Sequence, residues 1–214
     1  MKVLLPKIPA GLKEVIDTPK QLKSDARFDR VMLRGFDALT IAAPKMKFDE
    51  CALDRVILVN AALDGISMLD TEIRGCDLSA AVLSAGSLDR VRFTNCRMAG
   101  VDLSRARLQN VTFVGCRLDM ANFRFAHCDG VVFEDCTLIE SDFQVSELAN
   151  IELSGCTIER TMFDQCKIRH VDARGSELRE IHGWQYLRGL TIDHTQLMTI
   201  APELAGEYGI SVKS

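Results

Sequence analysis

The sequence predicts an all-β solenoid, a four-sided parallel β-helix that runs from about Ala26 to Leu178. Three observations predict it. Large apolar residues recur with a period of five, small residues precede each of them by two positions, and five cysteines recur with a period of 20. A chain that buries two residues in every five and turns a corner after each fifth residue produces all three patterns.

The five-residue period is carried by two columns of positions. Leu or Phe fills 22 of the 31 positions at every fifth residue from Phe28 to Leu178, and the other nine hold Met, Ile, Ala or Cys. Together with the positions two earlier, the columns cover 62 positions and contain no charged residue. About 16 would be expected by chance at this charge content. Two inward residues separated by an outward one indicate a strand, and 31 cycles without drift exclude a helix of period 3.6.

The 20-residue period predicts the number of sides. Twenty residues are four pentapeptides, so a coil with four sides would place the five cysteines in one stacked column. Stacked parallel strands lie about 4.8 Å apart, so the array makes nearly eight coils and a rod about 37 Å long. The residues in register are Cys76, Cys96, Cys116, Cys136 and Cys156, then Phe93, Phe113 and Phe133, and Phe123, Phe143 and Phe163.

Several pentapeptides resemble the consensus of the pentapeptide-repeat family, a small residue, Asp or Asn, Leu or Phe, and two polar residues. The close matches begin at Cys76, Val101, Ala121 and Ser141. The resemblance implies a right-handed quadrilateral β-helix. The first coils depart from the consensus, because Phe36 stands at a small position and Ala38 and Ala43 at large ones. We therefore expect irregular packing there.

The repeat divides the chain into an N-terminal cap over 1–25, the β-helix over 26–185, and an irregular turn with a helical C-terminal cap over 186–214. Each cap is expected to cover an unpaired edge of the solenoid. Thr18 and Pro19 predict a helix start. Near the C-terminus, apolar residues recur at helical spacing, Gly209 is expected to end the helix, and Pro202 to kink or split it.

The C-terminal tail carries a second resemblance. The stretch from Gly189 to Asp193, then Gln196 and the stretch from Gly209 to Val212, is similar to the tail of family members that protect DNA gyrase from quinolones. In those proteins the tail contributes to the dimer. The resemblance implies a homodimer through the C-terminal cap, with candidate contacts at Trp184, Tyr186, Leu197, Ile200 and Leu204.

Composition narrows the function. The chain is 47% hydrophobic and carries a net charge of −4, so we expect no basic patch for direct nucleic-acid binding. The apolar run Val3-Leu4-Leu5 stops at Pro6 and Lys7, which is too short for an export signal or a membrane span. The expected location is the cytoplasm.

No catalytic, cofactor or metal site is expected. Cysteines stacked in one column cannot converge on zinc as a tetrahedron, so we expect them to be free, shielded thiols. The four histidines, His127, His170, His182 and His194, belong to no catalytic or metal motif. A core filled with Leu and Phe should leave no interior pocket. The sequence therefore predicts a protein that is not an enzyme.

The primary functional hypothesis is a rigid scaffold that binds an unidentified protein partner. Phe125 and Val145 should point outward one coil apart and could form a contact surface, although two exposed apolar residues are also normal on any protein. Another candidate surface is the face whose central residues recur every 20 positions from Leu58 to Leu178. It carries seven acids, among them Asp119, Glu140 and Glu159, and four arginines.

The alternative is that the chain mimics DNA, binds a type II topoisomerase (DNA gyrase or topoisomerase IV) and modulates quinolone susceptibility. This function is implied by the resemblance. DNA carries one charge per about 1.7 Å, so a rod of this length would have to match about 22 charges. The face centred on Leu58 to Leu178 has a net charge of −3, from seven acids and four arginines. The scaffold hypothesis is therefore preferred.

Overall fold

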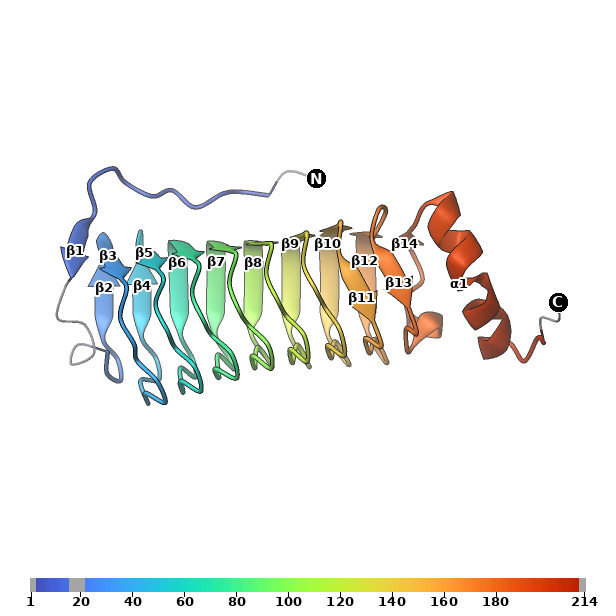
Figure 1. Ribbon diagram of the computed structural model, residues 1–214, viewed down its shortest axis with the longest axis horizontal. Coiled ribbons are helices and arrows are strands. Elements are labelled where there is room, and N and C mark those ends of the chain that lie inside the picture. The colour runs from blue at the N-terminus through green and yellow to red at the C-terminus, as the bar shows by residue number, and fades with distance from the viewer. Residues whose placement is uncertain (1–2, 16–21, 212–214) are drawn as a thin grey trace.

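The computed structural model describes residues 3–15 and 22–211 and is a long rod with a helix across one end (Figure 1). About nine turns of parallel β-solenoid form the rod, which confirms the predicted fold class. The array is longer than the eight coils predicted because β1 (Lys13–Val15) and β14 (Leu190–Thr191) pair with the outermost coils. Thr18 and Pro19 lie outside the described residues.

All paired strands are parallel, and in the body each residue pairs with the one 20 positions later, as Phe113 does with Phe133. The offset is 18 where β1 joins β3 and 19 where β14 joins β12. The coil register therefore holds throughout the body and changes at both ends. The other strands are β2 (Arg27–Asp29), β3 (Val31–Arg34), β4 (Lys47–Asp49), β5 (Ala52–Asp54), β6 (Ser67–Arg74), β7 (Ser87–Thr94), β8 (Arg107–Val114), β9 (His127–Glu134), β10 (Glu147–Ser154), β11 (Thr157–Glu159), β12 (Lys167–Asp172) and β13 (Glu177–Arg179).

The corners of the coil share one backbone conformation. Every fifth residue from Asp25 to Glu180 has a positive φ, and only eight of these 32 residues are glycine. The left-handed region costs an ordinary residue roughly 1–2 kcal/mol. Hydrogen bonds between coils offset that cost, as when the backbone amide of Val145 donates to the carbonyl of Asp164 over 2.9 Å.

The interior is filled by stacked side chains. Phe93, Phe113 and Phe133 stack with ring centroids 4.9 and 5.0 Å apart. A second stack on the adjoining face meets the first edge-on, with the centroids of Phe123 and Phe133 6.2 Å apart. One apolar cavity of about 30 Å³ lies near the C-terminal end, lined in part by Phe163 and Trp184. The expectation of no interior pocket is thus corrected, although the space is about that of one water molecule.

All eight cysteines are buried and free. In the 20-residue column four of the five thiols donate to backbone carbonyls 23 residues earlier, as Cys96 does to Ile73 over 3.5 Å and Cys136 to Phe113 over 3.5 Å, whereas Cys116 donates to Val114. Ser176 continues this column and donates to the carbonyl of Leu153 over 3.1 Å. Cysteine here is a small buried side chain that can donate one weak hydrogen bond.

The C-terminal cap closes the last coil with polar side chains. A short 3-10 helix, η1 (Trp184–Tyr186), leads through β14 to α1 (His194–Glu207), which begins with a capping box formed by Asp193 and Gln196. The buried Gln196 amide donates to the carbonyls of Ala173 and Ser176 over 2.6 and 2.7 Å. Gln196 lies 20 residues after Ser176 and reaches 23 residues back, so it occupies the next place in the cysteine column.

Two expectations for the helix had different outcomes. Gly209, with a φ of 70°, ends α1, and the amide of Ile210 donates to the carbonyl of Ala205 over 2.8 Å, which confirms the predicted cap. Pro202 does not split the helix, which continues through it. Pro202 is exposed, so the carbonyl that loses its helical partner can bond water instead.

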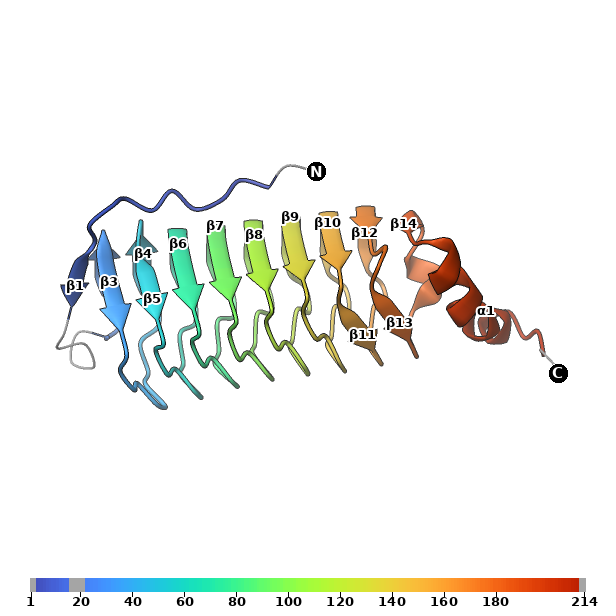
Figure 2. The same cartoon turned by 45° about the horizontal axis from the view of Figure 1, so that its top comes forward.

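The N-terminal coils also differ from expectation. Phe36 is half-buried and Ala38 and Ala43 are buried, yet coil pairing there stays in register, so the expected irregularity is absent from this pairing. Residues 3–12 leave the N-terminal edge altogether and run along the outside of the rod, beside β6 and β8 (Figures 1 and 2).

The buried thiols give a first prediction. Burial raises the pKa of Cys128 to about 12, so almost no thiolate forms there at pH 8. We expect none of the eight cysteines to react with a thiol reagent in the native protein, and all eight to react once it is unfolded in urea. Rapid native reaction of most thiols would contradict the inward assignment of the column.

Gly183 gives a second prediction. It has a φ of 89°, and a Cβ there would lie 2.8 Å from backbone atoms of Phe163 and Asp164. Gly183→Ala should lower the free energy of unfolding by about 2 kcal/mol or more in urea titrations. Gly175→Ala is the matched control, because its φ is 78° and its Cβ would meet nothing within 4 Å. Equal losses in the two variants would contradict the close approach at Gly183.

Candidate protein-interaction surface

A network of hydrogen-bonded polar side chains covers one side of the coil, which we call the Phe123 face. Its buried centres are Leu63, Leu83, Leu103, Phe123, Phe143 and Phe163. The residue before each centre points outward, and in the middle coils it is Asp102, Asn122 or Asp142. Because the strand alternates, the residue after each centre also points outward, so every coil offers two side chains to a partner.

The Asp and Asn residues are fixed by their own coil. The side chain of Asp102 accepts from the amide of Ser104 over 2.9 Å, and Asp142 accepts from that of Gln144 over 2.8 Å. Short carboxylates and amides favour this bond to the amide two residues on. The acidic or amide position of the repeat therefore stabilises the short strand that carries it.

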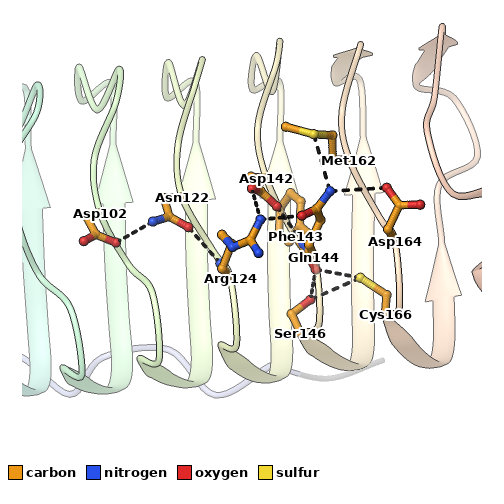
Figure 3. A network of polar contacts seen from close by, with 10 residues as sticks. All are labelled: Asp102, Asn122, Arg124, Asp142, Phe143, Gln144, Ser146, Met162, Asp164 and Cys166. Carbon is orange, nitrogen blue, oxygen red and sulfur yellow. Dashed lines mark hydrogen bonds and ion pairs between the residues drawn. The ribbon is translucent and has the colours of Figure 1, made fainter.

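Further bonds join neighbouring coils into one network (Figure 3). Asn122 donates to Asp102 over 3.0 Å, Arg124 donates to Asp142 over 3.0 Å, and Gln144 donates to Asp164 over 3.3 Å. Beneath them, Ser146 and Cys166 both donate to the carbonyl of Phe143 over 2.7 Å. The polar groups are thus held in place before any partner arrives, which reduces the entropy lost on binding.

Large apolar side chains stand at both edges of this network. Met120 is 59% exposed, Phe125 44% and Val145 37%. All three occupy corners with φ between 57° and 61°. The guanidinium carbons of Arg105 and Arg124 each lie 5.7 Å from the centroid of the Phe125 ring. We call Phe125, Val145, Arg105 and Arg124 the Phe125 patch, whereas Met120 lies at the opposite edge of the Phe123 face.

The predicted surface residues fall into two groups. Phe125 and Val145 lie at equivalent corners of adjacent coils, and the backbone of each is bonded to the next coil. Asp119, Glu140 and Glu159 belong to the neighbouring side centred on Leu118, where Asp119 accepts from the amide of Ile139 over 3.3 Å. Sequence reasoning missed Met120, Arg105 and Arg124. Met120 could have been found from its number, because the corner residues are those whose numbers are multiples of five.

The acids of the Leu118 side are largely paired. Arg160 bonds Glu140 over 3.0 Å, also contacts Glu159, and lies 3.9 Å from Glu180. Arg97 lies 3.9 Å from Asp77, and Arg179 lies 3.4 Å from Glu177. An arginine beside each of these acids interrupts the negative potential that a continuous acidic row would give.

The five predicted cap and dimer residues divide by burial. Ile200 is buried against the last coil, and Trp184 and Leu204 pack partly against the core. The indole of Trp184 donates to Glu203 over 3.4 Å, which fixes it beneath α1. Tyr186 and Leu197 are exposed, together with Met198 and Tyr208. A homodimer through this cap stays a prediction. Of the five predicted contacts, Tyr186 and Leu197 are exposed and could reach a second copy of the chain.

Within residues 3–15 and 22–211 there is no group of three or more His, Cys, Asp or Glu side chains that could hold a metal ion. No helix of this part of the chain is long and apolar enough to cross a membrane. The four histidines are exposed.

Comparison with known proteins agrees with the geometry. The family described as "Pentapeptide repeat region" matches residues 46–123, 86–163 and 106–182, which together cover more than half of the chain. No curated protein matches the sequence.

Two solved structures are similar to this chain. HetL, a pentapeptide repeat protein involved in heterocyst differentiation regulation from the cyanobacterium Nostoc, is 14% identical; the match covers 78% of this chain and 87% of HetL, with a TM-score of 0.53. QnrB1, a plasmid-mediated fluoroquinolone resistance protein, is 15% identical; the match covers 81% and 99% of the two chains, with a TM-score of 0.40. The chain belongs to the pentapeptide-repeat family.

Proposed function

We propose that this chain is a non-enzymatic scaffold that binds a protein partner through the Phe125 patch. The observation that carries the proposal is the exposed Phe125 ring with the guanidinium groups of Arg105 and Arg124 beside it, next to the exposed Val145. Val145 is β-branched and stands in the left-handed region at a φ of 61° with its side chain exposed. Every corner of the coil adopts this conformation, but a β-branched residue is less stable in it than most residues, so Val145 lowers stability while it presents an apolar side chain to solvent.

The chemistry of the patch suits a protein partner. Aromatic and arginine side chains contribute most to binding at protein interfaces, and the patch places Arg105 and Arg124 beside Phe125. The adjoining network from Asp102 to Asp164 supplies fixed polar groups that could surround a buried centre. A partner surface with an apolar centre and acidic groups to meet the arginines would complement it.

The alternative partner, a type II topoisomerase bound by DNA mimicry, fits the charges less well. Mimicry requires a dense and continuous row of negative charge. On the Leu118 side Arg160 lies among Glu140, Glu159 and Glu180, and Arg97 lies beside Asp77. The pairing supports the scaffold over the mimic.

The proposal predicts opposite effects on stability and binding. Val145→Asn should raise the free energy of unfolding by about 1 kcal/mol, because asparagine tolerates the left-handed region better. The same variant, and more strongly Phe125→Ser, should reduce the partner recovered after crosslinking in cell extract, quantified against wild type by mass spectrometry.

Gln165→Asn is the matched control, since Gln165 occupies the same corner one coil later at a φ of 59°. It should leave partner recovery unchanged. If Phe125→Ser and Gln165→Asn recover the same proteins in the same amounts, the Phe125 patch is not the binding surface. A Val145→Asn variant that is less stable than wild type would remove the argument from strain.

A further inference from the structure

The N-terminal arm, residues 3–12, contacts the rod in a regular way (Figures 1 and 2). The amide of Lys7 donates to the carboxylate of Asp70 over 2.9 Å, and the amide of Leu4 donates to the side chain of Asn110 over 3.3 Å. Asp70 and Asn110 occupy the same corner position two coils apart. The arm therefore follows one corner of the solenoid along its axis.

The spacing of these bonds matches a polyproline II segment. Two coils span about 9.6 Å. The three residues from Leu4 to Lys7 span about 9.3 Å in a polyproline II helix, which has three residues per turn. Pro6 and Pro9 fix their own φ at the value this helix needs and keep the residues before them extended. The period of the arm thus matches every second coil of the rod.

Burial along the arm follows a period of three except at Ile8. Val3, Pro6, Pro9 and Leu12 are half-buried, as is Ile8, whereas Leu4, Lys7 and Ala10 are exposed. Thr112, two residues beyond Asn110 on β8, is buried although it occupies an outward position of its strand. One edge of the arm packs on the rod, and the other faces solvent.

The side chains that accept hydrogen bonds from the arm are themselves held in place by hydrogen bonds within the rod. Arg90 donates twice to Asp70, over 2.8 Å each, and once to Asp89 over 2.9 Å. Asn110 donates to Asp89 over 3.5 Å, so four side chains form a chain over three coils. Hydrogen bonding from Arg90 lowers the pKa of Asp70, which therefore remains a carboxylate. The two ends of this chain are the oxygens that accept the arm.

We propose that the corner from Asp70 to Asn110 is a docking site for an extended, proline-spaced apolar segment of a protein, and that the N-terminal arm is its resident, exchangeable occupant. The arm is held by two hydrogen bonds from its backbone to side chains and by one half-buried edge. These contacts are few, so the arm can be displaced. A competing segment would donate one backbone amide to Asp70 and the amide three residues earlier to Asn110. It would also carry apolar residues along one edge.

The test removes the arm from the docking site without altering the residues of the site. In the full-length variant Pro6→Gly with Pro9→Gly, the arm loses its preference for the extended form, while Asp70, Arg90 and Asn110 are unchanged. A fluorescent peptide with the sequence of residues 3–12 should bind this variant at least tenfold more tightly than wild type, measured by anisotropy. The melting temperature should stay within about 2 °C of wild type, because the coils are untouched.

Asn110→Ala in the same background should abolish peptide binding. Asn150→Ala is the matched control, since Asn150 lies in the same column, donates to Asp129 over 2.7 Å and bonds no described residue of the arm. No peptide binding to the Pro6→Gly, Pro9→Gly variant would overturn the proposal, as would equal binding to wild type or equal losses from the two asparagine variants.

Amide hydrogen exchange in the otherwise wild-type chain tests whether the arm occupies the docking site, independently of the peptide. The amides of Leu4 and Lys7 should be protected, and Asn110→Ala should speed exchange at Leu4 while Asn150→Ala should not. Unprotected amides at both residues in wild type would also overturn the proposal.

Discussion

The closure of each coil in 20 residues is the constraint on which the rest of the structure depends. Four corners, each a single residue with positive φ, return the chain to its starting direction, so every side chain lies above its counterpart in the previous coil. That stacking places phenylalanine on phenylalanine and cysteine on cysteine inside, and arginine beside acid outside. The outer ion pairs and the inner stacks follow from one geometry.

The ends show what happens where the constraint is released. The pairing offset falls from 20 to 18 at β1 and to 19 at β14, and each end covers its edge differently. At the C-terminus, Gln196 takes the next place in the cysteine column, and Glu203 accepts from the amide of Glu180 over 2.8 Å. At the N-terminus the chain adds a strand and then turns along the rod. A solenoid without such covers would expose unpaired backbone.

The columns could be predicted from the sequence because burial excludes charge from fixed positions, and the cysteine spacing gave the number of sides. The corner conformation could not, since most corners hold residues such as Arg90 or Val145 that rarely adopt a positive φ. The role of Gln196 was hidden because its column continues across an irregular turn. The docking of residues 3–12 depends on a side-chain network spread over 40 residues, from Asp70 to Asn110, and no local pattern reveals it.

The candidate surface was predicted only in part for the same reason. Phe125 and Val145 stood out as apolar residues at outward positions, but Arg105 and Arg124 joined them only when adjacent coils were placed side by side. Glu140 and Glu159 were predicted as surface acids, but coil stacking places Arg160 in contact with both of them. The position of a residue in the repeat shows whether its side chain points outward. The stacking of the coils determines which outward side chains contact one another.

Deletion of whole and partial coils tests the 20-residue closure most directly. Removing residues 136–155 should give a folded, shorter rod with its cap still docked, because every later residue keeps its column. Removing residues 136–140 moves every later residue by one side, so Gln196 no longer continues the cysteine column, and the melting temperature should fall much further. A five-residue deletion as stable as the 20-residue deletion would contradict the closure.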